Sequence, residues 1–286
     1  MWEGRSCEAS PYPDYAAMKD TQMKPPELCQ CLEDTTYFIN VYFQEGQEEP
    51  ELISAGSGVA VNSRADLLTA AHVVTSRLPV RQEDVKDPNS VILAMSKGGP
   101  LQRYEPIFCS LRVTLDGYLT APLTVDLALL RPISSQSSVP FLPISTESPV
   151  LGTQVLMAGY PDDMELPFAF DRLLNQAHWQ VQAQRFNVDI ARRLLMIRSG
   201  IVGHRSGVVI NEQYAGHIFY IDNVLHSGAS GGPVINYDGE IVGVLTERAI
   251  TAVPYEESPK LRVPSGAAVA VTPCLILEKL RQVGII

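Results

Sequence analysis

The stretch Ser227-Gly228-Ala229-Ser230-Gly231-Gly232-Pro233 is the most informative part of this sequence. Ser230 is preceded by one glycine and followed by two, and glycine permits tight turns that other residues resist. Such a turn exposes a hydroxyl group and directs backbone N–H groups at one point, which suits a nucleophile beside an oxyanion hole. An ordinary glycine-rich turn carries the same residue types, so this stretch alone leaves both interpretations open.

Two upstream segments offer the partners that a serine nucleophile needs. Leu68-Thr69-Ala70-Ala71-His72 ends an apolar run on a histidine, and Val125-Asp126-Leu127-Ala128-Leu129-Leu130 places a carboxylate near the start of another. A serine hydroxyl does not ionise near neutral pH, so a base must accept its proton, and histidine is the usual base. Taken singly, these side chains would be an ordinary packed histidine, a turn or capping aspartate and a turn serine. Their order favours a catalytic triad.

The order His, Asp, Ser with these local sequences resembles the chymotrypsin/trypsin clan of serine proteases, and within it the bacterial HtrA-type branch. The resemblance extends over about residues 36–284. It is also carried by three flanking segments: Gly56-Ser57-Gly58-Val59-Ala60-Val61, Tyr220-Ile221-Asp222-Asn223-Val224-Leu225 and Gly239-Glu240-Ile241-Val242-Gly243-Val244.

Many short apolar runs separated by turn residues predict an all-β protein. The resemblance implies two six-stranded antiparallel β-barrels of the chymotrypsin type. We expect a polar N-terminal extension at residues 1–35, an N-terminal barrel at 36–135 and a C-terminal barrel at 136–286. The extension is rich in Pro, Asp and Glu, a composition typical of a loose arm.

Two segments have helical rather than strand periodicity. Residues 273–283 are amphipathic, begin at a proline and stop before Gly284, which predicts a C-terminal helix. Residues near 162–196 space their apolar side chains at about 3.6, which predicts a helical insertion. A helix packed on the barrel and a lid beside the active site both remain open. No peptide-binding domain of the kind found in HtrA proteins is expected after the C-terminal helix.

The resemblance assigns a role to each site residue. Ser230 would be the nucleophile, His72 the general base and Asp126 the residue that orients the imidazole. The backbone N–H groups of Gly228 and Ser230 would form the oxyanion hole. Ala229 departs from the aspartate of the digestive enzymes and from the asparagine usual in HtrA proteins. Activation through an ion pair with a newly cleaved N-terminus is therefore not expected, and order in the oxyanion loop is expected to depend on a partner or on the insertion.

By family alignment, Leu225, His226 and Ser227 border one side of the primary specificity pocket, and Leu245, Thr246, Glu247 and Arg248 border the other. Asp222 lies too far from Ser230 in sequence to be an acidic pocket floor. We therefore expect a small or medium apolar side chain before the scissile bond. His226 either favours an acidic group or merely lines the loop.

Composition limits the partners. The net charge of −10 argues against nucleic acid and against anionic membrane surfaces, because both need a basic face. No secretion signal or membrane helix is evident in the sequence, and the five cysteines are an odd number, which favours thiols in a reducing, cytoplasmic setting. No metal or organic cofactor is expected, since Cys29-Gln30-Cys31 has no histidine nearby to complete a zinc site.

The sequence thus predicts a cytoplasmic serine endopeptidase that acts on a protein or peptide substrate through an acyl-enzyme, with a regulatory protein as a possible partner. Two alternatives remain open. The fold can serve as a catalytically silent peptide-binding module, or the same scaffold can act as an esterase or acyltransferase.

Overall fold

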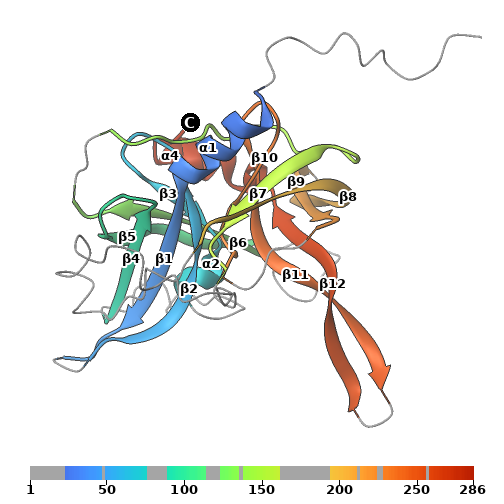
Figure 1. The fold of residues 1–286 in the computed structure, drawn as a ribbon, viewed down its shortest axis with the longest axis horizontal. Helices are drawn as coiled ribbons and strands as arrows, with labels where there is room; N and C mark the ends of the chain where they lie inside the picture. Colours follow the sequence, from blue (N-terminus) through green and yellow to red (C-terminus); the bar gives the residue numbers. More distant parts are fainter. Residues whose placement is uncertain are drawn as a thin grey trace, which may run out of the picture.

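The computed structural model describes residues 23–46, 49–75, 89–113, 123–134, 138–161, 194–210, 213–223, 228–255 and 258–286. These form two closed, antiparallel, six-stranded β-barrels that lie side by side (Figure 1), so the predicted chymotrypsin-like fold class is confirmed. The predicted helical insertion lies almost entirely outside the described residues. Leu194 and Leu195, at its end, are not helical, and Met196 already begins a strand.

The first barrel has the strand order β1-β2-β3-β6-β5-β4. The strands are β1 (Thr36–Phe43), β2 (Glu51–Ala60), β3 (Leu67–Thr69), β4 (Ser90–Ser96), β5 (Gln102–Val113) and β6 (Leu123–Pro132). Strand β1 is mostly apolar, which suits a strand whose two faces are both buried. Ile39 and Val41 fill the barrel, while Phe38 packs outside it against Tyr160. One short helix, α2 (Ala71–Thr75), follows β3 directly.

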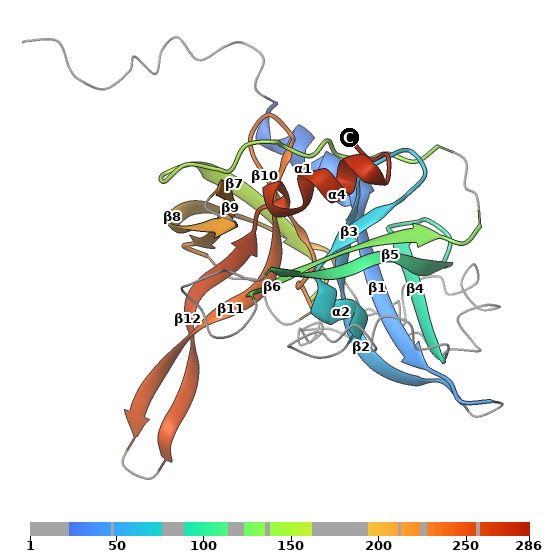
Figure 2. The same ribbon diagram turned by 180° about the vertical axis from the view of Figure 1, so that it is seen from behind.

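The second barrel has the order β10-β11-β12-β9-β8-β7. Its strands are β7 (Gln154–Gly159), β8 (Met196–Ile210), β9 (Gln213–Ile221), β10 (Pro233–Ile235), β11 (Ile241–Tyr255) and β12 (Ser258–Val271). Strands β11 and β12 continue beyond the barrel as a paired ribbon that projects from the body of the molecule (Figures 1 and 2). Phe219 and Ile221 are fully buried in the core of this barrel.

Helix α1 (Pro25–Thr35) lies within the segment that the composition assigned to a polar extension. Its proline at the first position and the Lys24–Glu27 capping box favour a helix start. Leu28 and Leu32 are one turn apart and fully buried, while Gln30 between them is exposed. The helix is therefore held by packing against the barrels.

The C-terminal segment is a 3₁₀ turn, η6 (Pro273–Ile276), followed by helix α4 (Leu277–Gln282), where the sequence predicted a single helix. Both views place α4 beside α1 at one end of the molecule (Figures 1 and 2). No helix in the described ranges is long and apolar enough to span a membrane.

A single buried apolar cluster joins the two barrels and the two terminal helices. It includes Leu28, Leu32, Val59, Leu68, Leu127, Leu129, Leu156, Ala158, Val244, Leu275, Ile276 and Leu280. Because this cluster takes side chains from both barrels, it fixes one barrel against the other. It thereby also fixes the relative positions of the residues where the two barrels meet.

Candidate active site

Helix α2 presents His72 at the edge of the first barrel. Ala71, Val73 and Val74 are buried in the barrel core, whereas the His72 side chain keeps 22% of its surface exposed. The apolar neighbours of the histidine thus anchor the short helix, and the His72 side chain is left partly at the surface.

Asp126 holds His72 through two hydrogen bonds. The His72 backbone N–H donates to Oδ1 at 2.9 Å, and the ring Nδ1 lies 2.7 Å from Oδ2. The carboxylate is only 13% exposed, so this pairing is largely shielded from water. Two contacts to one residue fix both the position of the histidine and the orientation of its ring, and Nε2 is the ring nitrogen that Asp126 does not engage.

The turn that carries Ser230 requires glycine at two positions. Gly228 and Gly231 have φ values of +83° and +85°, in the left-handed region that residues with a Cβ resist. At Gly231 a Cβ would also overlap the carbonyl oxygen of Ser57 and the hydroxyl of Thr69. Ser230, between these glycines, is partly exposed. The backbone conformation of this turn therefore requires glycine at these two positions.

The backbone N–H groups of the turn fall into two kinds. Gly231 donates to the Leu245 carbonyl at 2.7 Å, and Gly232 donates to the Ala229 carbonyl at 3.0 Å. Those of Gly228 and Ser230 have no acceptor among the described residues. These two groups are the ones that the sequence assigned to an oxyanion hole.

The turn packs directly against the strands that lead to His72. The Ser57 N–H donates to the Ser230 carbonyl at 2.8 Å, and the Ser57 hydroxyl donates to the Gly228 carbonyl at 2.9 Å. Gly231 lies against Thr69, three residues before His72. The structure thus brings the segments of His72, Asp126 and Ser230 to one place between the barrels.

The hydroxyl of Ser230 donates to the Thr246 carbonyl at 3.3 Å, a long contact for two oxygens. Within the described ranges no hydrogen bond joins Ser230 to His72. Catalytic hydrogen bonds are often loose in the absence of substrate, and a rotation of the hydroxyl about its χ1 bond changes its partner.

Of the predicted pocket residues, Leu225, His226 and Ser227 lie outside the described residues. Leu245 and Thr246 are buried on β11, and Glu247 next to them is exposed. Asp222 is exposed and accepts a hydrogen bond from the Ile201 N–H at 2.6 Å, which ties it to β8. Its carboxylate thus has a structural partner.

Ala229 is only 2% exposed and belongs to the core of the second barrel. It packs on Gly159, where an added Cβ would come within 2.7 Å of the Ala229 Cα. The side chain at this position therefore fills space and offers no polar group to the turn.

Sequence reasoning missed Ser57, which contacts the turn from β2, and Tyr160, which contacts Ser57. The Tyr160 N–H donates to the Ser57 hydroxyl at 2.9 Å. Ser57 is 171 residues from Gly228, and no local spacing in the sequence signals their contact. The placement of Ser57 between two glycines in a buried strand was the one available indication that its side chain is confined.

No arrangement of three or more His, Cys, Asp or Glu side chains suited to a metal ion occurs in the described ranges. Cys29 and Cys31 both lie on α1 and are partly buried.

Comparison with known proteins bears on the family. No curated protein matches the chain. The model of the trypsin-like peptidase domain matches residues 56–244, well over half of the chain, and this range contains His72, Asp126 and Ser230. Together with the two barrels, this match shows that the chain belongs to the trypsin-like peptidase domain family.

Proposed function

We propose that this protein is a serine endopeptidase in which Ser230, His72 and Asp126 act as the catalytic triad. The observation that carries the proposal is the double hydrogen bond of Asp126 to His72 beside the docked Ser230 turn. A packed histidine needs only one partner, whereas a base that must turn one ring nitrogen toward a nucleophile gains from a fixed ring.

In the proposed reaction, Ser230 Oγ attacks the carbonyl carbon of the scissile bond as its proton passes to His72 Nε2. Negative charge then develops on the carbonyl oxygen, where the N–H groups of Gly228 and Ser230 stabilise it. Collapse of this intermediate breaks the C–N bond, and His72 gives its proton to the departing amine. Water attacks the resulting acyl-enzyme by the same route and releases Ser230.

Digestion of a peptide library tests this proposal. Wild-type protein should cleave internal bonds, and Ser230→Ala prepared in the same way should not. Equal product from both forms would refute a serine endopeptidase at this site.

For specificity, we propose a small or medium apolar residue before the scissile bond. Leu245 and Thr246 offer no charge, and Asp222 is already engaged by the Ile201 N–H. Glu247, the charged residue beside them, is exposed to solvent, so a basic substrate side chain would lack a buried counter-ion from these residues. A strict preference for Lys or Arg in the library profile would refute this part of the proposal alone.

A catalytically silent peptide-binding module is the second candidate function. It is favoured by the contact of Ser230 Oγ with the Thr246 carbonyl, because a hydroxyl held there is turned from its base. The two functions differ in turnover. A silent module would bind peptides without product formation and would be unaffected by Ser230→Ala.

We further propose that the enzyme works in the cytoplasm under the control of a partner protein. The cysteines in the described ranges form no disulfide, which fits a reducing compartment. Ala229 supplies no polar anchor for the turn, so order there depends on other contacts. Full peptidase activity of the purified chain by itself would argue against a required partner.

A further inference from the structure

We propose that Ser57 is a positioning residue that holds the oxyanion-hole turn in its working shape. The inference rests on the proposed function, because it concerns the same turn. Ser57 lies on β2 in the first barrel, whereas the turn belongs to the second barrel. The residue therefore acts across the junction of the two barrels.

Ser57 binds both residues whose N–H groups are assigned to the oxyanion hole. Its hydroxyl donates to the Gly228 carbonyl at 2.9 Å, and its own N–H donates to the Ser230 carbonyl at 2.8 Å. In each case the carbonyl is bound and the N–H of the same residue is left without a described acceptor. Because a peptide plane joins the carbonyl of one residue to the N–H of the next, these bonds hold the two planes on either side of the plane that carries the Ser230 N–H, and the plane that follows the Gly228 N–H.

The hydroxyl of Ser57 is itself held in place. It accepts a hydrogen bond from the Tyr160 N–H at 2.9 Å while it donates to Gly228, so both of its roles are set by the protein. Ser57 is fully buried, and Tyr160 is 6% exposed. Water therefore has little access to replace either bond.

Tyr160 is anchored from the opposite side. Its ring packs edge-on against Phe38 with 5.8 Å between ring centroids, and its hydroxyl donates to the Thr36 carbonyl at 3.4 Å. Thr36 is the residue directly after α1. A continuous path of contacts thus runs from the end of α1 through Tyr160 and Ser57 to Gly228.

The turn needs such an anchor for a physical reason. Gly228 has no side chain to restrict its backbone, so its peptide planes can rotate at little cost. The side chain of Ala229, the next residue, packs in the barrel core, and its carbonyl accepts the Gly232 N–H from within the turn itself. Among the described residues, the two bonds from Ser57 are the hydrogen bonds that tie the Gly228 and Ser230 carbonyls to the first barrel.

The test compares Ser57→Ala with Thr272→Val. Thr272 is also fully buried, and its hydroxyl accepts the His217 N–H at 3.1 Å, but it is remote from the turn in its contacts. Both variants remove a buried hydroxyl that serves a backbone N–H, so both should lower stability similarly. Only Ser57→Ala should lower kcat, by about tenfold, with KM changed less than about twofold, since removal of an oxyanion donor itself costs roughly 100-fold.

Hydrogen exchange supplies a readout that needs no turnover. In Ser57→Ala the amides of residues 228–232 should exchange faster than in the wild type, and in Thr272→Val they should not. Ser57→Cys keeps a weaker donor of similar size, so its kcat and exchange rates should fall between those of the wild type and Ser57→Ala. This comparison also serves if Ser57→Ala does not fold.

The outcomes separate the two proposals. An active wild type with kcat and turn exchange unchanged in both Ser57 variants would overturn the role of Ser57 and leave the peptidase intact. An equal loss of kcat in Thr272→Val would also overturn it, because the effect would then follow stability alone. A wild type without turnover would refute the proposed function, while faster exchange in Ser57→Ala would still support the anchor.

Discussion

At the scale of single residues, the pairing of Asp126 with His72 is the contact on which the proposed chemistry most depends. Asp126 accepts from both the backbone and the ring of the histidine, so it sets the tautomer as well as the position. An asparagine would keep the size of the side chain but could present an N–H where the ring now donates, which favours the wrong tautomer.

Asp126→Asn should therefore lower kcat by roughly 10⁴-fold, the loss known for the same change in the chymotrypsin-type triad. Steady-state hydrolysis of a cleaved library peptide measures it. Asp238→Asn, an exposed aspartate in the turn after β10, is the matched control and should keep wild-type kcat. A kcat for Asp126→Asn close to that of the control would remove Asp126 from the proposed triad.

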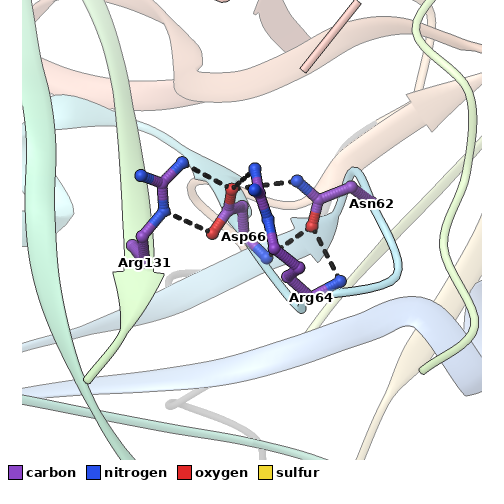
Figure 3. Close-up of polar contacts among 4 residues, drawn as sticks. All are labelled: Asn62, Arg64, Asp66 and Arg131. Carbon is purple, nitrogen blue, oxygen red and sulfur yellow. Dashed lines mark hydrogen bonds and ion pairs between the residues drawn. The ribbon is translucent and has the colours of Figure 1, made fainter. Parts of the chain in front are cut away.

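Another aspartate, the fully buried Asp66, stabilises the first barrel (Figure 3). Arg131 binds it in a two-pronged manner, with Nε 3.0 Å from Oδ1 and Nη2 2.9 Å from Oδ2. Arg64 and the Asn62 side chain also donate to Oδ2. Asp66 precedes β3 and Arg131 lies on β6, so the cluster ties together the two strands that position His72 and Asp126.

Burial raises the pKa of Asp66, but the hydrogen bonds from Arg131 and Asn62 outweigh it, so the pKa is lowered overall. A carboxyl group whose pKa is lower in the folded state stabilises the protein above its unfolded pKa, about 4, and loses that contribution as the pH falls.

Asp66→Ala should lower the free energy of unfolding by about 3 kcal/mol near neutral pH, because it leaves Arg131 without its buried partner. The difference between wild type and variant should shrink as the pH falls below about 4. Denaturant titrations at several pH values measure both effects. A difference that stayed constant, or grew, in acid would contradict the charged role of Asp66.

At this scale, the sequence can indicate candidate residues where the signal lies in their immediate neighbours along the chain. His72 ends an apolar run and Ser230 lies in a glycine turn, and each pattern was visible without the fold. The anchoring role of Ser57 was not, because it depends on contacts with Tyr160 and Gly228 that only the packing of the two barrels creates.

At the scale of elements, α1 shows how packing can override composition. The segment is mostly polar, but Leu28 and Leu32 at i and i+4 place two apolar side chains on one face. Both are fully buried, in the cluster that also holds Leu280 of α4. Two apolar residues are too few to reveal a helix in the sequence, so the extension was expected to be a loose arm.

Leu28→Ala should destabilise the protein by about 3 kcal/mol, since it leaves a cavity in the shared core. Gln30→Ala, on the exposed face of the same helix, should change stability by less than about 0.5 kcal/mol. Thermal and denaturant unfolding measure both. Equal stability of the two variants would mean that α1 is not packed as described.

For other elements, the sequence predicted the type of secondary structure but not its exact bounds. Residues 196–202 and 208–210 are two short apolar runs of the kind from which strands were expected, and the structure has one continuous strand there, β8. Residues 204–207 between the runs pair with β9, and Gly203 lies at a register shift, because backbone hydrogen bonding does not require apolar side chains. The C-terminal helix begins as a 3₁₀ turn with Pro273 at its first position, a difference in helix type that the amphipathic pattern does not indicate.

At the scale of the whole molecule, the two barrels share one hydrophobic core. Leu68 and Leu127 of the first barrel meet Leu156 and Val244 of the second within the same buried cluster. The site lies where the barrels join, with His72 and Asp126 on one side and Ser230 on the other. Separation of the two barrels would therefore expose apolar surface and, at the same time, move Ser230 away from His72 and Asp126.

We expect the two barrels to unfold in a single cooperative transition. The exchange free energies of the most protected amides in β1 and in β9 should agree within about 1 kcal/mol. Native-state hydrogen exchange measures them. If the β1 amides exchanged with a free energy well below that of the β9 amides, the first barrel would open while the second stayed folded, which would contradict a shared core.

Reaction with a fluorophosphonate probe, mapped to its residue by mass spectrometry, tests the central claim most directly. A serine with an activated hydroxyl and an oxyanion hole reacts with this probe, whereas an ordinary turn serine does not. The account predicts one adduct, on Ser230, which is lost in Ser230→Ala and much slower to form in His72→Ala. Failure of the wild type to form an adduct on Ser230, or equal labelling in His72→Ala, would contradict it.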